Sequence, residues 1–180
     1  GQVLKMNSGA NAPEWGTDRG GKIGQVISTH KQDSFSTTNG ISGSNWTEVT
    51  GLSTAITPSA TSSKIWVTGS IMVSDSAPNR VYIRLYRGST SIGQASDSGL
   101  SSSEVHKSAY HGGTTSNSQN ISINFLDTPN TTSATTYKIM ICHNQADSAS
   151  TTFVNRHNNS ASGVSDDHQT SQITLMEVLA

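Results

Sequence analysis

The sequence predicts an all-β domain, either a sandwich or a barrel, on three observations. Short runs alternate apolar with polar residues, turns of Gly, Asn and Pro separate these runs, and β-branched residues dominate them. Helix-forming residues with a 3.6-residue period are absent. At 180 residues the chain is long enough for one domain with a hydrophobic core and short for two.

The predicted strands follow one another from residue 23 to the end of the chain. The clearest is 64–74, in which alternate residues from Ile65 to Val73 share one face. The segment 80–87 places Val81, Ile83 and Leu85 on one side, and Gly88 predicts a hairpin turn after it. In chain order, the predicted strands are 23–30, 34–38, 46–50, 52–57, 64–74, 80–87, 91–95, 121–125, 137–141, 151–155 and 173–179.

Composition excludes several function classes. Ser, Thr, Asn and Gly together make up about 45% of the chain, charged residues only 13%, and the formal net charge is −1. No basic face is visible, so we expect no nucleic-acid partner. No apolar run reaches 18 residues and no charged-then-apolar leader is present, so we expect neither membrane insertion nor a signal peptide. The near-zero charge and the periodic apolar runs indicate a folded protein rather than a disordered one.

The first 21 residues differ from the rest and predict an N-terminal connector, with the β domain in residues 22–180. The connector has one apolar step at Val3 and Leu4, a turn-rich stretch and then Trp15, which is too little to bury a core of its own. Its Gly-Gln-Val-Leu start and Trp, together with 46–58, 62–67 and 171–180, resemble the C-terminal β tips of bacteriophage tail fibres and virion appendages.

This resemblance narrows the fold and the setting. It implies an antiparallel jelly-roll sandwich of the C1q and tumour-necrosis-factor shape, assembled as a homotrimer. It also implies a virion protein that is synthesised in the host cytoplasm and contacts other virion proteins through residues 1–21.

Several predicted strands are apolar on both faces, which independently favours an oligomer. One face of each strand fills the sandwich, so the second must be covered by something else. Neighbouring subunits are the simplest cover, although loops that fold back over the strands are an alternative. The candidate interface residues are Trp66, Met72, Met140 and Met176.

Candidates for catalysis and metal binding are weak. The six histidines do not pair with one another or with Cys at a spacing typical of a zinc site, and the Asp166-Asp167-His168 segment is better explained as a solvated loop. Carboxylates are few, and Glu177 alternates within the last predicted strand, where we expect it to pair with Arg or Lys. We therefore predict no enzyme activity, no cofactor and no metal. The single cysteine, Cys142, lies in an apolar run and is predicted to be buried.

Binding is the remaining function, and loops usually carry it. Two long segments, 96–117 and 144–169, hold amides, carboxylates, histidines and one aromatic ring, groups that can contact sugars. The candidate receptor-binding residues are Tyr110, His111, Arg156, His157, Asp166 and Asp167.

The sequence therefore favours a non-catalytic fibre tip, from a tail fibre or a capsid fibre, that binds a host surface receptor. The receptor is expected to be a glycan or a protein. A virion decoration or cement protein without receptor binding is the main alternative, and a secreted cellular lectin is a weaker one.

Overall fold

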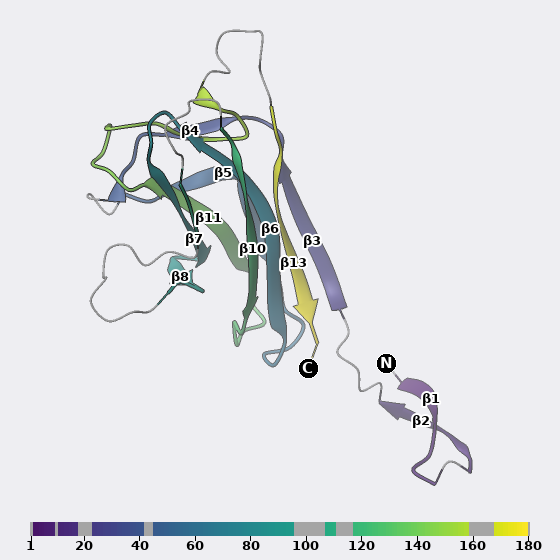
Figure 1. Cartoon of the computed structure of the whole chain (residues 1–180). Coiled ribbons are helices and arrows are strands. Elements are labelled where there is room, and N and C mark those ends of the chain that lie inside the picture. The colour runs from purple at the N-terminus through teal and green to yellow at the C-terminus, as the bar shows by residue number, and fades with distance from the viewer. Residues whose placement is uncertain are drawn as a thin grey trace.

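The computed structural model describes residues 2–9, 11–17, 23–41, 45–95, 107–110, 117–158 and 168–179. These residues form antiparallel β-sheets and no α-helix. Two of the sheets pack face to face around one core (Figure 1). The predicted all-β jelly-roll sandwich is therefore confirmed.

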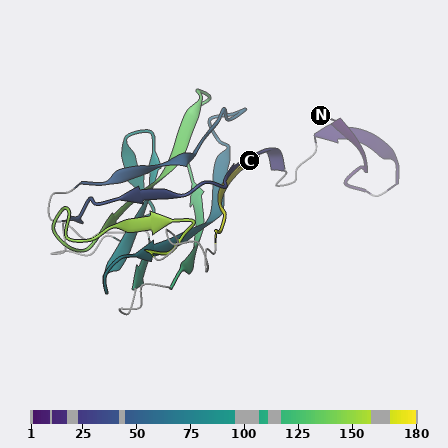
Figure 2. The same cartoon turned by 90° about the horizontal axis from the view of Figure 1, so that it is seen from above.

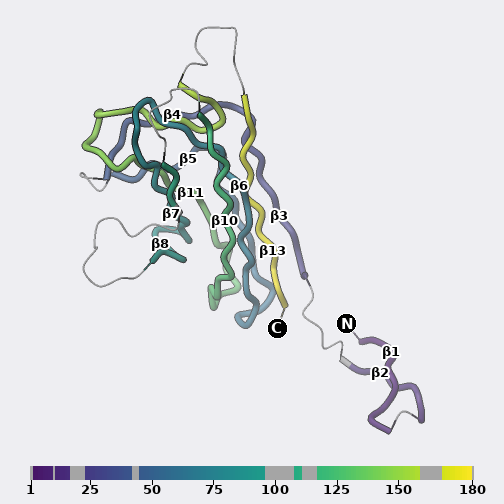
Figure 3. Tube along the Cα trace, viewed as in Figure 1, coloured from purple at the N-terminus to yellow at the C-terminus, as the bar shows by residue number. Residues whose placement is uncertain are grey.

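The larger sheet has six strands, with β13 between β3 and β6 in the middle of the sheet. The other edge of β6 pairs first with β10 and then with β12, which in turn pairs with β4. Figure 3 shows β3 and β13 running side by side along their length. The strands are β3 (Ile23–Lys31), β4 (Phe35–Thr37), β6 (Lys64–Asp75), β10 (Gln119–Asp127), β12 (Thr152–Val154) and β13 (Ser171–Val178).

The second sheet has five strands. Strand β11 pairs with β5 on one side and with β7 on the other, and the far edge of β7 pairs with β8 and β9. The chain crosses repeatedly between the two sheets, as in a jelly roll. The strands are β5 (Thr47–Ile56), β7 (Arg80–Arg87), β8 (Thr90–Ile92), β9 (Lys107–Tyr110) and β11 (Thr135–His143).

The core lies between the two sheets and consists of the residues that alternation predicted. Ile65, Val67, Ile71 and Val73 of β6 are fully buried, as are the three apolar residues of β7. At the centre of β6 the alternation passes through Gly69, where a Cβ atom would lie 2.4 Å from the carbonyl oxygen of Gln172. Glycine at this position therefore allows β13 to approach β6 closely. Cys142 is buried as predicted, and burial raises the pKa of its thiol to about 12.

Residues 2–17 form a separate two-stranded sheet, in which β1 (Gln2–Met6) pairs with β2 (Pro13–Thr17). We call it the N-terminal hairpin. Figures 1 and 2 show it beyond the start of β3 and apart from the sandwich, at the same end as the C-terminus. The sequence predicted an extension here but not its hairpin structure.

Three details differ from the sequence-based expectations. The segments 46–50 and 52–57 form one strand, β5, because Gly51 takes a φ of 89° and continues the strand through an irregularity. The segment 96–117, which was expected as a loop, contains strand β9. Among the described residues, Glu177 has no Arg or Lys partner: its carboxylate accepts hydrogen bonds from the backbone and hydroxyl of Ser59 and from Gln25.

Candidate functional site

An apolar row crosses the outer face of the six-stranded sheet. In the strand register, Val26 of β3 lies opposite Met176 of β13, Met176 opposite Trp66 of β6, and Trp66 opposite Leu126 of β10. We call these four residues the apolar row. Val26 is 58% exposed, Leu126 50% and Trp66 38%, while Met176 is half-buried. Four directly opposed strands thus present a continuous apolar surface to solvent.

The surroundings of the apolar row are mostly polar, with one charged side chain, Lys64, two residues from Trp66 on the same face of β6. The indole N–H of Trp66 donates to the side-chain oxygen of Asn124 at 2.6 Å, so the polar edge of the ring is already satisfied. The neighbouring row carries hydroxyls, with Ser28 and Thr174 2.8 Å apart. An exposed apolar patch that is rimmed by polar residues is typical of a protein contact.

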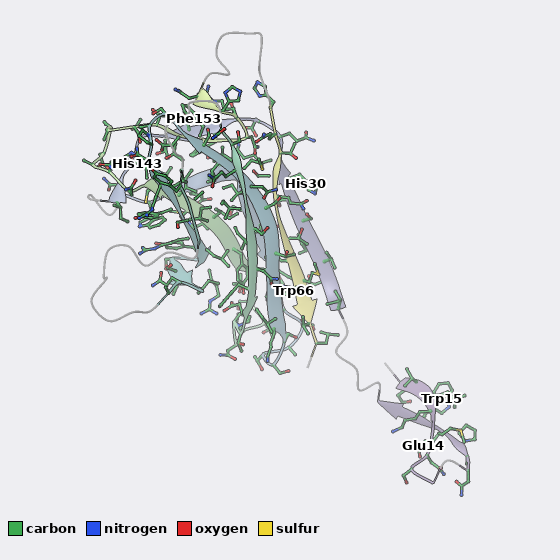
Figure 4. All side chains as sticks on the ribbon, viewed as in Figure 1. Glu14, Trp15, His30, Trp66, His143 and Phe153 are labelled. Atoms are coloured by element: carbon green, nitrogen blue, oxygen red, sulfur yellow. The ribbon has the colours of Figure 1, made fainter. Side chains whose placement is uncertain are left out.

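The N-terminal hairpin presents a second apolar surface. Leu4 lies opposite Trp15 and Met6 opposite Pro13, which places these four residues on one face of the hairpin. Leu4 is 61% and Trp15 68% exposed, and Figure 4 shows Trp15 in the hairpin, away from the labelled residues of the sandwich. The other face carries the exposed Lys5–Glu14 ion pair, at 3.6 Å. A two-stranded hairpin is marginally stable in water, so contact with another surface would stabilise it.

The four predicted interface residues do not form one patch. Trp66 and Met176 are neighbours in the apolar row. Met72 shares their face but lies six residues along β6 from Trp66, or about 20 Å at the usual strand rise. Met140 lies in the other sheet, where it is opposite Arg84 of β7 and Glu48 of β5. Val26 and Leu126, which complete the row, were missed because only the strand register brings them together.

The predicted receptor-binding residues also lie in different parts of the structure. Tyr110 is at the edge of the five-stranded sheet in β9 and is 57% exposed. The guanidinium of Arg156 lies 4.2 Å from the ring centre of Phe153, and its carbonyl accepts a hydrogen bond from Ser74. His157 is only 4% exposed, which argues against a direct contact with a receptor. His111, Asp166 and Asp167 lie outside the described residues.

Polar residues at the end of the sandwich opposite the N-terminal hairpin have structural roles. Figure 4 places His143 and Phe153 at that end. The buried His143 accepts a hydrogen bond from the backbone N–H of Gln145 on Nδ1, which leaves Nε2 to donate to the carbonyl of Thr38. Asp75 is likewise buried and accepts hydrogen bonds from Thr152 and Asn79. These side chains hold loops together and offer no open reaction site.

Within the described ranges, no three His, Cys, Asp or Glu residues gather closely enough to hold a metal ion. The same part of the chain has no helix that is long and apolar enough to cross a membrane.

Comparisons with known proteins add a distant likeness. No protein-family model and no curated protein matches the chain. A chain in the structure of infectious bursal disease virus Gt strain is similar, with a TM-score of 0.43 and 12% identity over 99% of this chain. A chain in the VP2 subviral particle of the same virus gives a TM-score of 0.39 at 14% identity over 99%. This chain covers 43% of the length of each.

Proposed function

We propose that this chain is the non-catalytic β tip of a phage tail fibre or capsid fibre, that it assembles as a homotrimer, and that it binds a receptor on the host surface. The observation that supports this most is the pair of uncovered apolar surfaces, the apolar row and the apolar face of the N-terminal hairpin. Each needs a protein partner, and a virion assembly supplies two kinds: other copies of the chain and other virion proteins.

The two surfaces have different roles in this proposal. The apolar row contacts neighbouring copies, because it is broad, uncharged and part of the rigid sandwich. The N-terminal hairpin contacts the rest of the particle, because it lies outside the sandwich at the end where the chain enters it. The opposite end of the sandwich and the outer face of the five-stranded sheet then remain available to the host.

Competition for adsorption tests the receptor-binding part. Purified chain is added to host cells before particles that carry it, and the adsorbed particles are counted. A receptor-binding tip reduces adsorption in proportion to its occupancy of the receptor, whereas heat-unfolded chain does not. If folded chain at a large excess leaves adsorption unchanged, the protein is a decoration or cement protein instead.

A further inference from the structure

The outer face of the five-stranded sheet has a composition unlike that of the apolar row. Three of the four tyrosines in the chain belong to strands β7 and β9, whereas the fourth, Tyr137, is buried in the core. Along β7, alternation turns Arg80, Tyr82, Arg84 and Tyr86 outward, because Val81, Ile83 and Leu85 are fully buried. We call this the aromatic face.

Arginine–aromatic contacts order the aromatic face. Tyr110 lies directly opposite Arg80 in the register, and the guanidinium of Arg80 lies 5.8 Å from the centre of the Tyr110 ring. Farther along β7, the guanidinium of Arg84 lies 4.2 Å from the centre of the Trp46 ring. Such cation–π contacts stabilise both partners and hold the ring and the guanidinium in a defined geometry. The backbone of Arg80 is itself fixed, since it exchanges hydrogen bonds of 2.8 and 3.0 Å with Asn144.

Two described carboxylates near the aromatic face, Glu48 and Asp147, already have partners. Glu48 accepts an ion-paired hydrogen bond from Lys138 at 2.8 Å. Asp147, in the loop after β11, accepts hydrogen bonds from the backbone N–H of Gly40 and from the side chain of Asn45. Arg80, by contrast, is exposed beside Tyr110, which is itself 57% exposed. Among the described residues, the part of the aromatic face around Arg80 and Tyr110 therefore presents a positive charge to a ligand.

We propose that the aromatic face, centred on Arg80 and Tyr110, binds a glycan that carries carboxylate groups. A guanidinium donates two parallel N–H bonds to a carboxylate, the geometry for which arginine is best suited. The Tyr110 ring offers a flat apolar surface to a sugar ring, and its hydroxyl, with that of Tyr82, offers hydrogen bonds to sugar hydroxyls. This inference rests on the proposed function and names both the receptor class and the surface that contacts it.

A second copy of the chain is a poorer occupant for the aromatic face. The apolar row already provides a surface for self-association, and it lies on the outer face of the opposite sheet. A copy that covered Arg80 would have to supply a carboxylate to avoid burying an unpaired charge. A flexible acidic glycan supplies that group at every repeat, and several copies of the chain on one tip would bind it more tightly through effective concentration.

The test uses the full chain and three carboxylate polymers, polygalacturonate, alginate and hyaluronate, with methyl-esterified polygalacturonate as the uncharged match. Binding is measured by biolayer interferometry at low and at physiological salt. We expect at least one acidic polymer to bind and the ester to bind far more weakly. Arg80→Ala should weaken binding by about tenfold or more, the value of one charged hydrogen bond. Tyr110→Ala should weaken binding more than Tyr110→Phe does.

Lys64→Ala is the matched control, because it removes one positive charge from the other sheet. It should leave binding unchanged, and circular dichroism melting verifies that every variant is folded. The inference is overturned if none of the three polymers binds, or if Arg80→Ala weakens binding no more than Lys64→Ala. These results are separate from the adsorption experiment: a chain that blocks adsorption but ignores acidic glycans keeps the proposed function and loses only this inference.

Discussion

Replacing Glu177 by Gln changes one of the few ionisable groups that the sandwich buries. The side chain is 1% exposed near the end of β13 and ties three segments together. Its carboxylate accepts hydrogen bonds of 2.6 Å from the backbone N–H and from the hydroxyl of Ser59, and one of 2.7 Å from Gln25. Glutamine keeps the shape but leaves a single neutral oxygen where two charged ones accepted these bonds.

The size of the effect follows from the pKa. Burial alone would raise the pKa of Glu177, but the hydrogen bonds from Ser59 and Gln25 outweigh it and lower the pKa from 4.5 to about 2. At 1.36 kcal/mol per unit, the full shift would be worth about 3.4 kcal/mol. Its partner Ser59 is exposed, so water can replace part of these hydrogen bonds in the variant, and we expect a loss of about 2 kcal/mol in the free energy of unfolding at pH 7.

The lowered pKa also predicts how the difference in stability between the parent and the variant changes with pH. A carboxyl whose pKa is lower in the folded state stabilises fully above its unfolded value of 4.5 and loses that contribution as the pH falls toward 2. Urea unfolding of the parent and the variant, at one protein concentration, should show a difference that is largest at pH 7 and shrinks below pH 4.5. A difference that stays constant from pH 7 to pH 2.5, or that is absent at pH 7, refutes the reasoning.

Three further changes test other parts of the fold. The Asp127 carboxylate accepts hydrogen bonds from the buried Tyr137 hydroxyl at 2.6 Å and from the guanidinium of Arg87 at 2.9 Å. Asp127→Ala leaves both groups without this partner and should lower the free energy of unfolding, measured in urea, by about 3 kcal/mol. Tyr137→Phe should lower it by only about 1 kcal/mol, and equal losses would contradict this assignment. Deleting residues 1–21 should change the free energy of unfolding of the sandwich by less than about 0.5 kcal/mol, because β1 and β2 pair with each other and with no other strand of the described residues. Loss of folding in a circular dichroism melt would place the N-terminal hairpin in the core.

Local alternation predicted most of the sandwich because central strands such as β6, β7 and β13 bury one face. The prediction from alternation failed where strand pairing or backbone conformation, and not the local pattern of apolar residues, determines the structure. The four residues of β9, Lys-Ser-Ala-Tyr, contain one buried apolar side chain, Ala109, and the strand forms because β7 offers it a free edge. Gly51 reads as a break in the sequence, yet its positive φ carries β5 through an irregularity without ending the strand.

The candidate surfaces were harder to predict than the strands. The sequence indicated that Trp66 and Met176 need cover, but Val26 and Leu126 join them only through a register between strands that are far apart in the chain. Similarly, Tyr110 was expected in a loop as an isolated aromatic residue. Its pairing opposite Arg80 places it beside the outward-facing tyrosines of β7. Spatial clusters of this kind depend on topology, which local periodicity does not specify.

The mass of the chain in solution tests the assembly on which the account depends. Sedimentation equilibrium at micromolar concentration should give about three times the chain mass of 18.9 kDa. Leu126→Lys, which places a charge in the apolar row, should shift the mass toward that of one chain, whereas Tyr86→Lys on the opposite outer face should not. A parent chain that sediments as a monomer, or a Leu126→Lys variant that keeps the parent mass, would contradict the assignment of the apolar row to contacts between copies.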